Sequence, residues 1–241
     1  VLDVTGLSII PYVFTGMALL MVGLAATTTA PVHQTVEAVR NPFSAIGVML
    51  GNRRFMVLMG SLLLCFVGNG AAIVFMPVRM AELGGTNQHV GTALMVMALS
   101  ETPAMLLHHR LVRFVRNDRL LTISLFFFIV KITVLALALS PTMLILAQMF
   151  QFLSFGLYMP SVVHEINSMV SEQQLTTALL VYASLTFGLG IMIGSSLGGI
   201  FADRFGVQAM LLMMAAGPTI GLVLRLLSGI PRQTVPSGGT E

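Results

Sequence analysis

Long apolar stretches separated by short polar ones dominate this sequence. A helix that crosses a bilayer needs about 20 mostly apolar residues, and each stretch is close to that length or longer. The pattern therefore predicts an all-α membrane protein with seven transmembrane helices. The predicted spans are 7–29, 54–77, 90–112, 120–139, 142–163, 175–201 and 207–228.

Turn-forming and charged residues lie at most of the boundaries between these spans, where helices are expected to end. The fourth and fifth spans are joined by only a few residues, so they are predicted to form a tight helical hairpin. The boundary sequences are NRR at 52–54, ELGGTNQH at 82–89, RNDR at 116–119, SP at 140–141, SEQQ at 171–174 and ADRFG at 202–206.

The longest connection, 30–53, separates one leading span from six that follow. It mixes polar and apolar residues, and we expect it to be a cytoplasmic central loop. The predicted domains are thus a leading helix (1–29), this loop, a six-helix bundle (54–228) and a cytoplasmic tail (229–241). The tail is rich in Pro, Gly, Ser and Thr, which predicts disorder.

Composition supports the membrane assignment. The chain is 56% hydrophobic and 9% charged, whereas a soluble domain carries about 25% charged residues. The single Cys65 lies in apolar sequence, so no disulfide framework is expected. The sequence has no HExxH, CxxC or nucleotide-binding glycine loop, so we expect no metal site, no cofactor, no nucleic-acid partner and no enzymatic activity. The chain begins at Val1 without a basic segment and cleavage site, so we expect no signal peptide, and we expect a fragment of a longer chain.

Arginine placement predicts the orientation in the membrane. Cytoplasmic segments of membrane proteins carry an excess of Arg and Lys. The predicted cytoplasmic side carries Arg40, Arg53, Arg54, Arg110, Arg113, Arg116, Arg119, Arg225 and Arg232, and the opposite side carries Arg79 and Arg204. The C-terminus is therefore expected in the cytoplasm and Val1 outside. His164 and Glu165 lie near the cytoplasmic side and are interpreted as interfacial, with a gate or proton-exit role as the alternative.

Two charged residues fall near the middle of predicted spans. Lys131, the only lysine, lies in the fourth span, and Glu101 lies in the third. A charge at the centre of a membrane helix costs roughly 2.5–3.5 kcal/mol, so we expect the two to pair. One interpretation is a structural ion pair that fixes helix register. The other is the polar centre of a transport path, with Glu101 as the protonated group and Lys131 modulating it; Pro103 would bend the helix beside it.

Neutral polar residues also occur at this depth. Gln148, Gln151 and Ser154 are spaced three residues apart in the fifth span, which predicts a polar stripe along one helix face. Such a stripe is expected to face a water-filled cavity, although one glutamine could instead bind a neighbouring helix. With Asn69 of the second span, these three are the candidate substrate-binding residues.

Glycines predict one close helix contact. Gly190, Gly194 and Gly198 recur every four residues in the sixth span. Small residues at this spacing allow another helix to approach closely. We therefore expect this face to be a helix-packing surface.

Two segments resemble the loop signature G-x-x-x-D-R-x-G of the major facilitator superfamily. The first is GGIFADRFG (198–206), in which Asp203, Arg204 and Gly206 match. The second, LVRFVRNDRLL (111–121), is similar to a degraded copy without the glycines. By this resemblance the last six spans correspond to the C-terminal half of such a transporter, and the first span to the last helix of the N-terminal half.

The charges within the spans are similar to those of the lactose-permease-like branch, the oligosaccharide and nucleoside proton symporters. Glu101 matches its acidic residue and Lys131 its basic residue, which implies roles in substrate binding and proton coupling. The sequence departs from the branch in three places. Gln151 and Ser154 stand where the sugar symporters have a His and a Glu, Asn69 stands where relatives can have an acidic group, and the sixth span lacks the lysine that would pair with that group.

The resemblance implies proton-coupled symport of a small polar organic solute (a sugar, nucleoside or organic acid) by alternating access. The implied partners are the substrate, protons, the lipid bilayer of the cell inner membrane and an N-terminal half. A proton-antiport exporter of drugs or metabolites is the main alternative. A non-transport scaffold would leave the charges within the spans unexplained. A retinal protein is disfavoured because its Schiff-base lysine belongs in the last helix, whereas Lys131 is in the fourth span.

Overall fold

A computed structural model describes residues 4–27, 47 and 50–228 of the chain. All regular elements in this part are helical. The chain divides into two compact units, Val1–Ala38 and Val39–Glu241. The first contains α1 (Val4–Thr27), where the sequence predicts the first span. Most of the predicted central loop and nearly all of the predicted tail lie outside the described residues.

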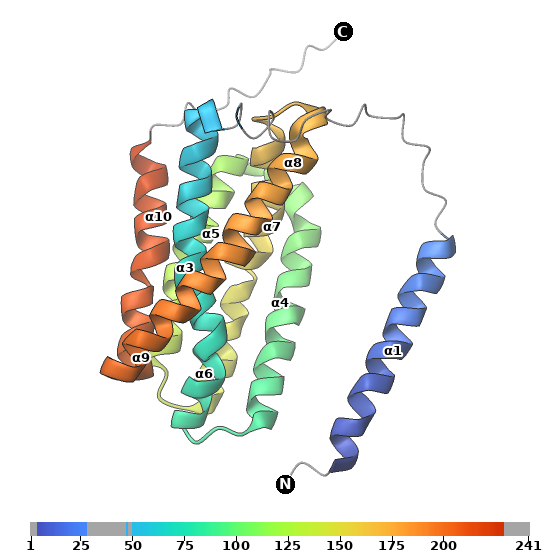
Figure 1. Ribbon diagram of the computed structural model, residues 1–241, viewed down its shortest axis with the longest axis vertical. Coiled ribbons are helices and arrows are strands. Elements are labelled where there is room, and N and C mark those ends of the chain that lie inside the picture. Colours follow the sequence, from blue (N-terminus) through green and yellow to red (C-terminus); the bar gives the residue numbers. More distant parts are fainter. Residues whose placement is uncertain (1–3, 28–46, 48–49, 229–241) are drawn as a thin grey trace. The chain divides into compact units, whose positions relative to one another are not determined.

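The second unit is a bundle of helices that run back and forth along a common direction (Figure 1). Its elements are α3 (Arg53–Glu82), α4 (Asn87–Phe114), α5 (Asn117–Leu137), α6 (Pro141–Ala147), η1 (Gln148–Gln151), α7 (Phe155–Asn167), α8 (Glu172–Ala183), η2 (Ser184–Gly190), α9 (Ile191–Met214) and α10 (Ala216–Leu227). Short loops join successive helices, as the closely spaced boundary signals predict.

In the described residues, five helical runs are long and apolar enough to cross a membrane, and Thr15–Thr27 within α1 is a shorter apolar helix. Seven spans were expected. The numbers differ partly because the predicted sixth and seventh spans merge into one helical run of 56 residues, Glu172–Leu227. This run contains a sharp change of direction at Gly206, whose φ of 80° and ψ of 160° are not helical. The break coincides with the predicted boundary at 202–206.

Local side-chain chemistry explains where several helices begin and end. The Asn52 side chain accepts hydrogen bonds from two backbone N–H groups in the first turn of α3. The Ser140 hydroxyl accepts one such bond, from the Met143 N–H of α6, and Pro141 occupies a first-turn position that needs no N–H donor. Gly84, after the end of α3, has a φ of 78°, which glycine adopts without strain. These residues confirm three of the predicted boundaries.

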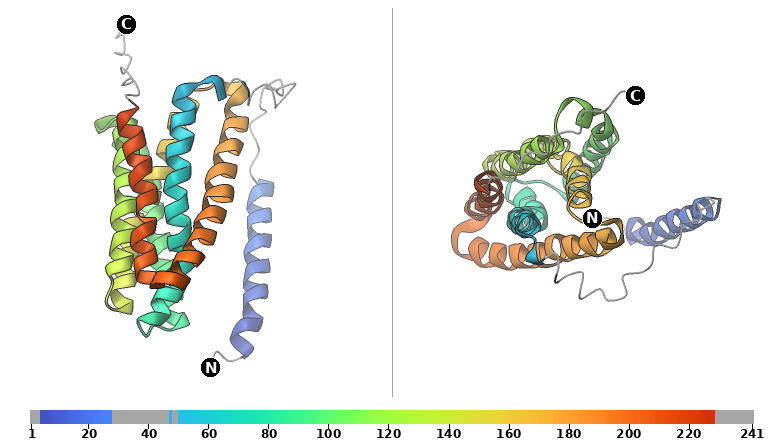
Figure 2. Two further views of the ribbon diagram at one scale, coloured as in Figure 1. Left: turned by 60° about the vertical axis from the view of Figure 1, so that its left-hand side comes forward. Right: turned by 90° about the horizontal axis from the view of Figure 1, so that it is seen from above.

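The central helix is α3, which packs most extensively against α9 and α10. Seen from above, α3 lies inside the bundle with the α8–α9 run along one side (Figure 2, right). Glycines of η2 and α9 permit this contact. A Cβ atom built on Gly194 would lie 2.1 Å from the Val67 backbone oxygen, and one on Gly190 would lie 2.8 Å from the Phe66 Cβ. The predicted small-residue face, with Gly198 against Ala71, is therefore turned toward α3.

Two clusters of buried apolar side chains fill the bundle. One includes Phe66, Phe128 and Tyr158, whose rings contact one another, and also the buried Cys65. The other includes Ile132 and residues of α3, α6 and α9. Lys131 follows Phe128 and precedes Ile132 on α5, so a charged side chain emerges where the two apolar clusters meet.

Candidate functional site

Lys131 lies inside the bundle, with only 3% of its surface exposed. Its ammonium group donates a hydrogen bond to the side-chain oxygen Oε1 of Gln151. Gln151 is itself 5% exposed, so both partners are shielded from solvent. A buried ammonium requires such an acceptor because losing its hydration is costly.

Glu101 reaches the same glutamine from α4. The Gln151 amide nitrogen Nε2 donates to the Glu101 carboxylate oxygen Oε2 at 3.1 Å. The expected direct pairing of Glu101 with Lys131 is therefore wrong in one respect, because the structure joins them through Gln151. An amide both accepts and donates hydrogen bonds, so one glutamine can bind an ammonium and a carboxylate at once. We call Glu101, Gln151 and Lys131 the central polar chain.

The helix that carries Gln151 is broken at this point. Residues Gln148–Gln151 form a 3₁₀ helix, and Ser154 has a φ of −82° and a ψ of −94° before α7 begins. Side chains three residues apart point the same way in a 3₁₀ helix, so Gln148 and Gln151 stay on one side, and the predicted stripe is interrupted only at Ser154. Ser154 is fully buried, and its hydroxyl donates to the Phe150 backbone oxygen at 2.9 Å. Gln148 is also buried, and its side-chain contact to the Leu144 oxygen is long, at 3.5 Å.

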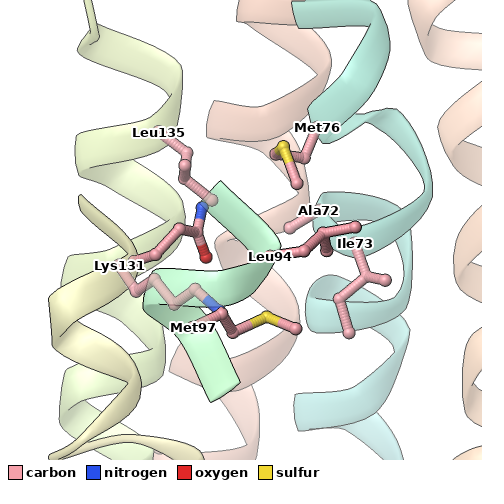
Figure 3. A pocket seen from close by; sticks show the side chains of 8 residues that line it. Ala72, Ile73, Met76, Leu94, Met97, Lys131 and Leu135 are labelled. Carbon is pink, nitrogen blue, oxygen red and sulfur yellow. The ribbon is translucent and has the colours of Figure 1, made fainter. Parts of the chain in front are cut away.

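A small pocket of about 20 Å³ opens beside the central polar chain, which is room for about one water molecule. Lys131 and Gln148 contribute its polar lining, and side chains from α3, α4 and α5 contribute an apolar lining (Figure 3). The apolar lining residues are Ala72, Ile73, Met76, Leu94, Met97 and Leu135. The structure therefore brings two of the predicted polar residues to a common pocket.

Asn69, Gln151 and Ser154 are not among the residues that line this pocket. Asn69 is 2% exposed, and its side-chain oxygen has no hydrogen-bond partner in the described part of the chain. The glycines on both sides of it contact the other helical segments closely. Asn69 thus lies within tightly packed helices, and its predicted substrate-binding role stays a prediction.

Gly156 was missed by the sequence-based reasoning, although it positions the central polar chain. A Cβ atom built on Gly156 would lie 2.6 Å from the Ala104 Cβ and 3.0 Å from the Glu101 backbone oxygen. Its lack of a side chain therefore lets α7 approach α4 where Gln151 binds Glu101. A glycine within an apolar helix, five residues after Gln151, was the available signal.

A second polar cluster lies at one end of the bundle. Glu165 is 2% exposed, and its carboxylate lies 3.3 Å from the Arg54 guanidinium and 3.7 Å from that of Arg225. The Asn117 amide donates to the other carboxylate oxygen at 3.4 Å and to the Ser161 backbone oxygen at 2.9 Å. The interfacial interpretation of Glu165 is therefore wrong, because its carboxylate joins α3, α5, α7 and α10. His164, by contrast, is exposed.

The loop motif lies within α9, at the break near Gly206. Asp203 and Arg204 are exposed, and neither takes part in an ion pair of the described residues. Gly206 supplies the positive φ that redirects the chain. Across the described residues, no group of three or more His, Cys, Asp and Glu side chains could hold a metal ion.

Comparison with known proteins identifies the family to which this chain belongs. The model of the MFS_1 like family matches residues 1–213. The chain belongs to this family. It is thus a multi-pass membrane protein of the major facilitator superfamily of transporters, whose members are generally not enzymes. The chain is also 27% identical over 181 residues to the maltose permease of Geobacillus stearothermophilus, a match that covers 74% of this chain and 45% of the permease. The matched part therefore spans less than half the length of that relative.

Proposed function

We propose that this chain forms the C-terminal half of a secondary active transporter that carries a small polar organic solute together with protons. The observation that carries the proposal is the central polar chain, in which a buried ammonium and a partly buried carboxylate share one glutamine beside a pocket. Charged groups in membrane helices are rare and most often mark substrate or ion paths. Family membership and the distant similarity to a maltose permease support the same proposal.

Proton coupling follows from the charge cost at Glu101. An ionised carboxylate near the middle of a span opposes movement of that region through a dry state, whereas a protonated carboxyl group is neutral. Protonation would therefore permit the loaded carrier to reorient. Proton release would restore the negative charge opposite Lys131 and return the site to its starting state.

The proposed orientation places the Glu165 end of the bundle in the cytoplasm. Arginines gather at this end of the described helices, at Arg53, Arg54, Arg110, Arg113, Arg116, Arg119 and Arg225, whereas Arg79 and Arg204 lie toward the opposite end. Arg40 and Arg232 lie outside the described residues. By the positive-inside rule the arginine-rich end faces the cytoplasm of the cell inner membrane.

Alternating access in this class of transporter is a rocking of two bundles about a site between them. The unit Val39–Glu241 supplies one bundle with six helical runs, once the break at Gly206 separates the last two. With α1 it makes the proposed total of seven transmembrane helices. Its small pocket would form one wall of the site, and an N-terminal half would supply the other. We therefore expect residues 1–241 alone to show no gradient-driven uptake in membrane vesicles.

The second candidate is a proton-antiport exporter of the same superfamily. The apolar lining of the pocket, which includes Met76, Leu94 and Met97, favours it because such side chains suit apolar compounds. The direction of proton-driven flux separates the two candidates. An imposed inward proton gradient should drive uptake by a symporter and efflux by an exporter.

The test of the proposal is the substitution Glu101→Gln in the transporter that contains this sequence. Glutamine mimics the neutral, protonated carboxyl group, so we expect exchange of substrate across the membrane to continue and gradient-driven accumulation to be lost. Glu172→Gln is the matched control, because Glu172 is exposed at the start of α8. If Glu101→Gln accumulates substrate as the unmodified protein does, Glu101 has only a structural role.

A further inference from the structure

The bundle carries few charges in its interior, and they fall into three separate groups. At the arginine-rich end, Glu165 is bound by Arg54 and Arg225. At the opposite end, Arg79 is bound by Glu82 and by two backbone oxygens. Near the middle, among the described residues, Glu101 and Lys131 are the charged pair. The middle of the bundle is thus neutral only while Glu101 is ionised.

Protonation of Glu101 would upset this balance. Lys131 would remain as a buried ammonium without an anion, which is strongly unfavourable in a medium of low dielectric constant. His108, which also faces α7, contacts the Ser161 hydroxyl and belongs to the arginine-rich end. None of the three interior charge groups therefore offers a second carboxylate that could replace Glu101.

A negatively charged ligand would restore neutrality. We propose that the substrate is a small organic monocarboxylate, which binds Lys131 through its carboxylate when Glu101 is protonated. This inference rests on the proposed function and names the substrate class for the same site. One proton and one monoanion carry no net charge together, so the transport step is electroneutral. A neutral sugar taken up with one proton would instead move one positive charge.

The pocket supplies one wall of a site with the chemistry that such a ligand needs. An ammonium has three N–H donors, and in the described structure that of Lys131 makes one hydrogen bond, to Gln151. Lys131 also lines the pocket, so the carboxylate can bind it there. Figure 3 shows Lys131 beside the side chains of Met97, Leu94 and Ile73, which would contact the apolar part of the ligand. A sugar, with hydroxyl groups on all sides, would leave these apolar side chains without suitable partners.

Methionine methyl groups report on this pocket directly. Met76 and Met97 line it, whereas Met213 is an exposed residue of α9 that does not. We would label the methionine methyl groups of the transporter that contains this sequence with ¹³C, in detergent. Met76→Leu and Met97→Leu identify their signals.

The probes are carboxylates with their neutral amides: acetate and acetamide, lactate and lactamide, isovalerate and isovaleramide, together with maltose. We expect saturable shifts of the Met76 and Met97 signals with at least one carboxylate and not with its amide, while the Met213 signal stays fixed. Glu101→Gln mimics the protonated state, so it should bind the same carboxylate more tightly and with less dependence on pH. Lys131→Gln should abolish the shifts, and Lys131→Arg, which keeps the charge, should retain them.

Two outcomes would overturn the inference. One is binding of maltose or of an amide as tight as that of the carboxylates. The other is a lack of response to every carboxylate in both the unmodified chain and Glu101→Gln. Neither outcome bears on whether Glu101→Gln separates exchange from accumulation. The substrate class can therefore be wrong while the proton-coupled function is right.

Discussion

Replacing Gln151 with leucine would remove the amide that joins Lys131 to Glu101. Each hydrogen bond to a charged group is worth roughly 1.5–3 kcal/mol. The bond to Lys131 falls at the upper end of this range, because the ammonium is 3% exposed and has no other acceptor in the described structure. The bond to Glu101 counts for less, because that carboxylate is partly exposed and regains hydration. Burial of leucine returns about 1 kcal/mol, so we expect a net destabilisation of about 3 kcal/mol.

The free energy of unfolding can be measured by titrating the protein in mixed micelles with a denaturing detergent and following helix content. Gln148→Leu is the matched control, because Gln148 is equally buried but makes only the long contact to Leu144. We expect it to change the stability by less than about 1 kcal/mol. The double substitution Lys131→Met with Gln151→Leu removes the stranded cation and should recover about 2 kcal/mol relative to Gln151→Leu. A Gln151→Leu protein as stable as the Gln148→Leu protein would refute the reasoning, as would a double variant with no recovery.

Two further predictions concern packing and the arginine-rich end. Gly194→Ala should destabilise the bundle by about 3 kcal/mol, because the added Cβ would lie 2.1 Å from a backbone oxygen. Gly188→Ala, whose added Cβ would have no neighbour within 4 Å among the described residues outside its own helix backbone, should be neutral or slightly stabilising in the same unfolding assay. Glu165→Gln should cost about 3 kcal/mol, because it leaves the buried guanidinium of Arg225 without its carboxylate, while the exposed Glu172→Gln should stay within about 0.5 kcal/mol of the unmodified protein. If the two glycine variants were equally stable, the close packing at Gly194 would be contradicted. If the two glutamate variants were equally stable, the contribution of the Glu165 ion pairs would be contradicted.

Much of the fold could be predicted from the sequence because each boundary depends on local chemistry. The apolar length of a span, the Asn52 and Ser140 caps, and the glycine at 206 act within a few residues of their own position. The close packing of one face of α9 against some other helix was predictable for a related reason. Glycines spaced four residues apart form one face of a helix, whatever that face meets. The partner helix, α3, was not predictable, because nothing local to the glycines specifies it.

The polar residues were harder to place. Lys131 and Glu101 stand out in the sequence because a charge within an apolar span needs compensation wherever it lies. The manner of compensation depends on distances between helices, which single-sequence periodicity does not contain. The same limit explains Glu165. It lies near a span end, where a carboxylate is usually exposed, and only the approach of Arg54 and Arg225 from other helices makes its burial tolerable.

The helix that carries the predicted polar stripe is not regular along its length. The 3₁₀ turn at 148–151 keeps Gln148 and Gln151 on one side, whereas the non-helical φ and ψ of Ser154 interrupt the helix before α7 begins. Gln151 then meets Lys131 and Glu101, while Ser154 turns to its own backbone. The regular helix pattern is thus interrupted at the residues on which the proposed function depends, which is where departures from local rules are expected.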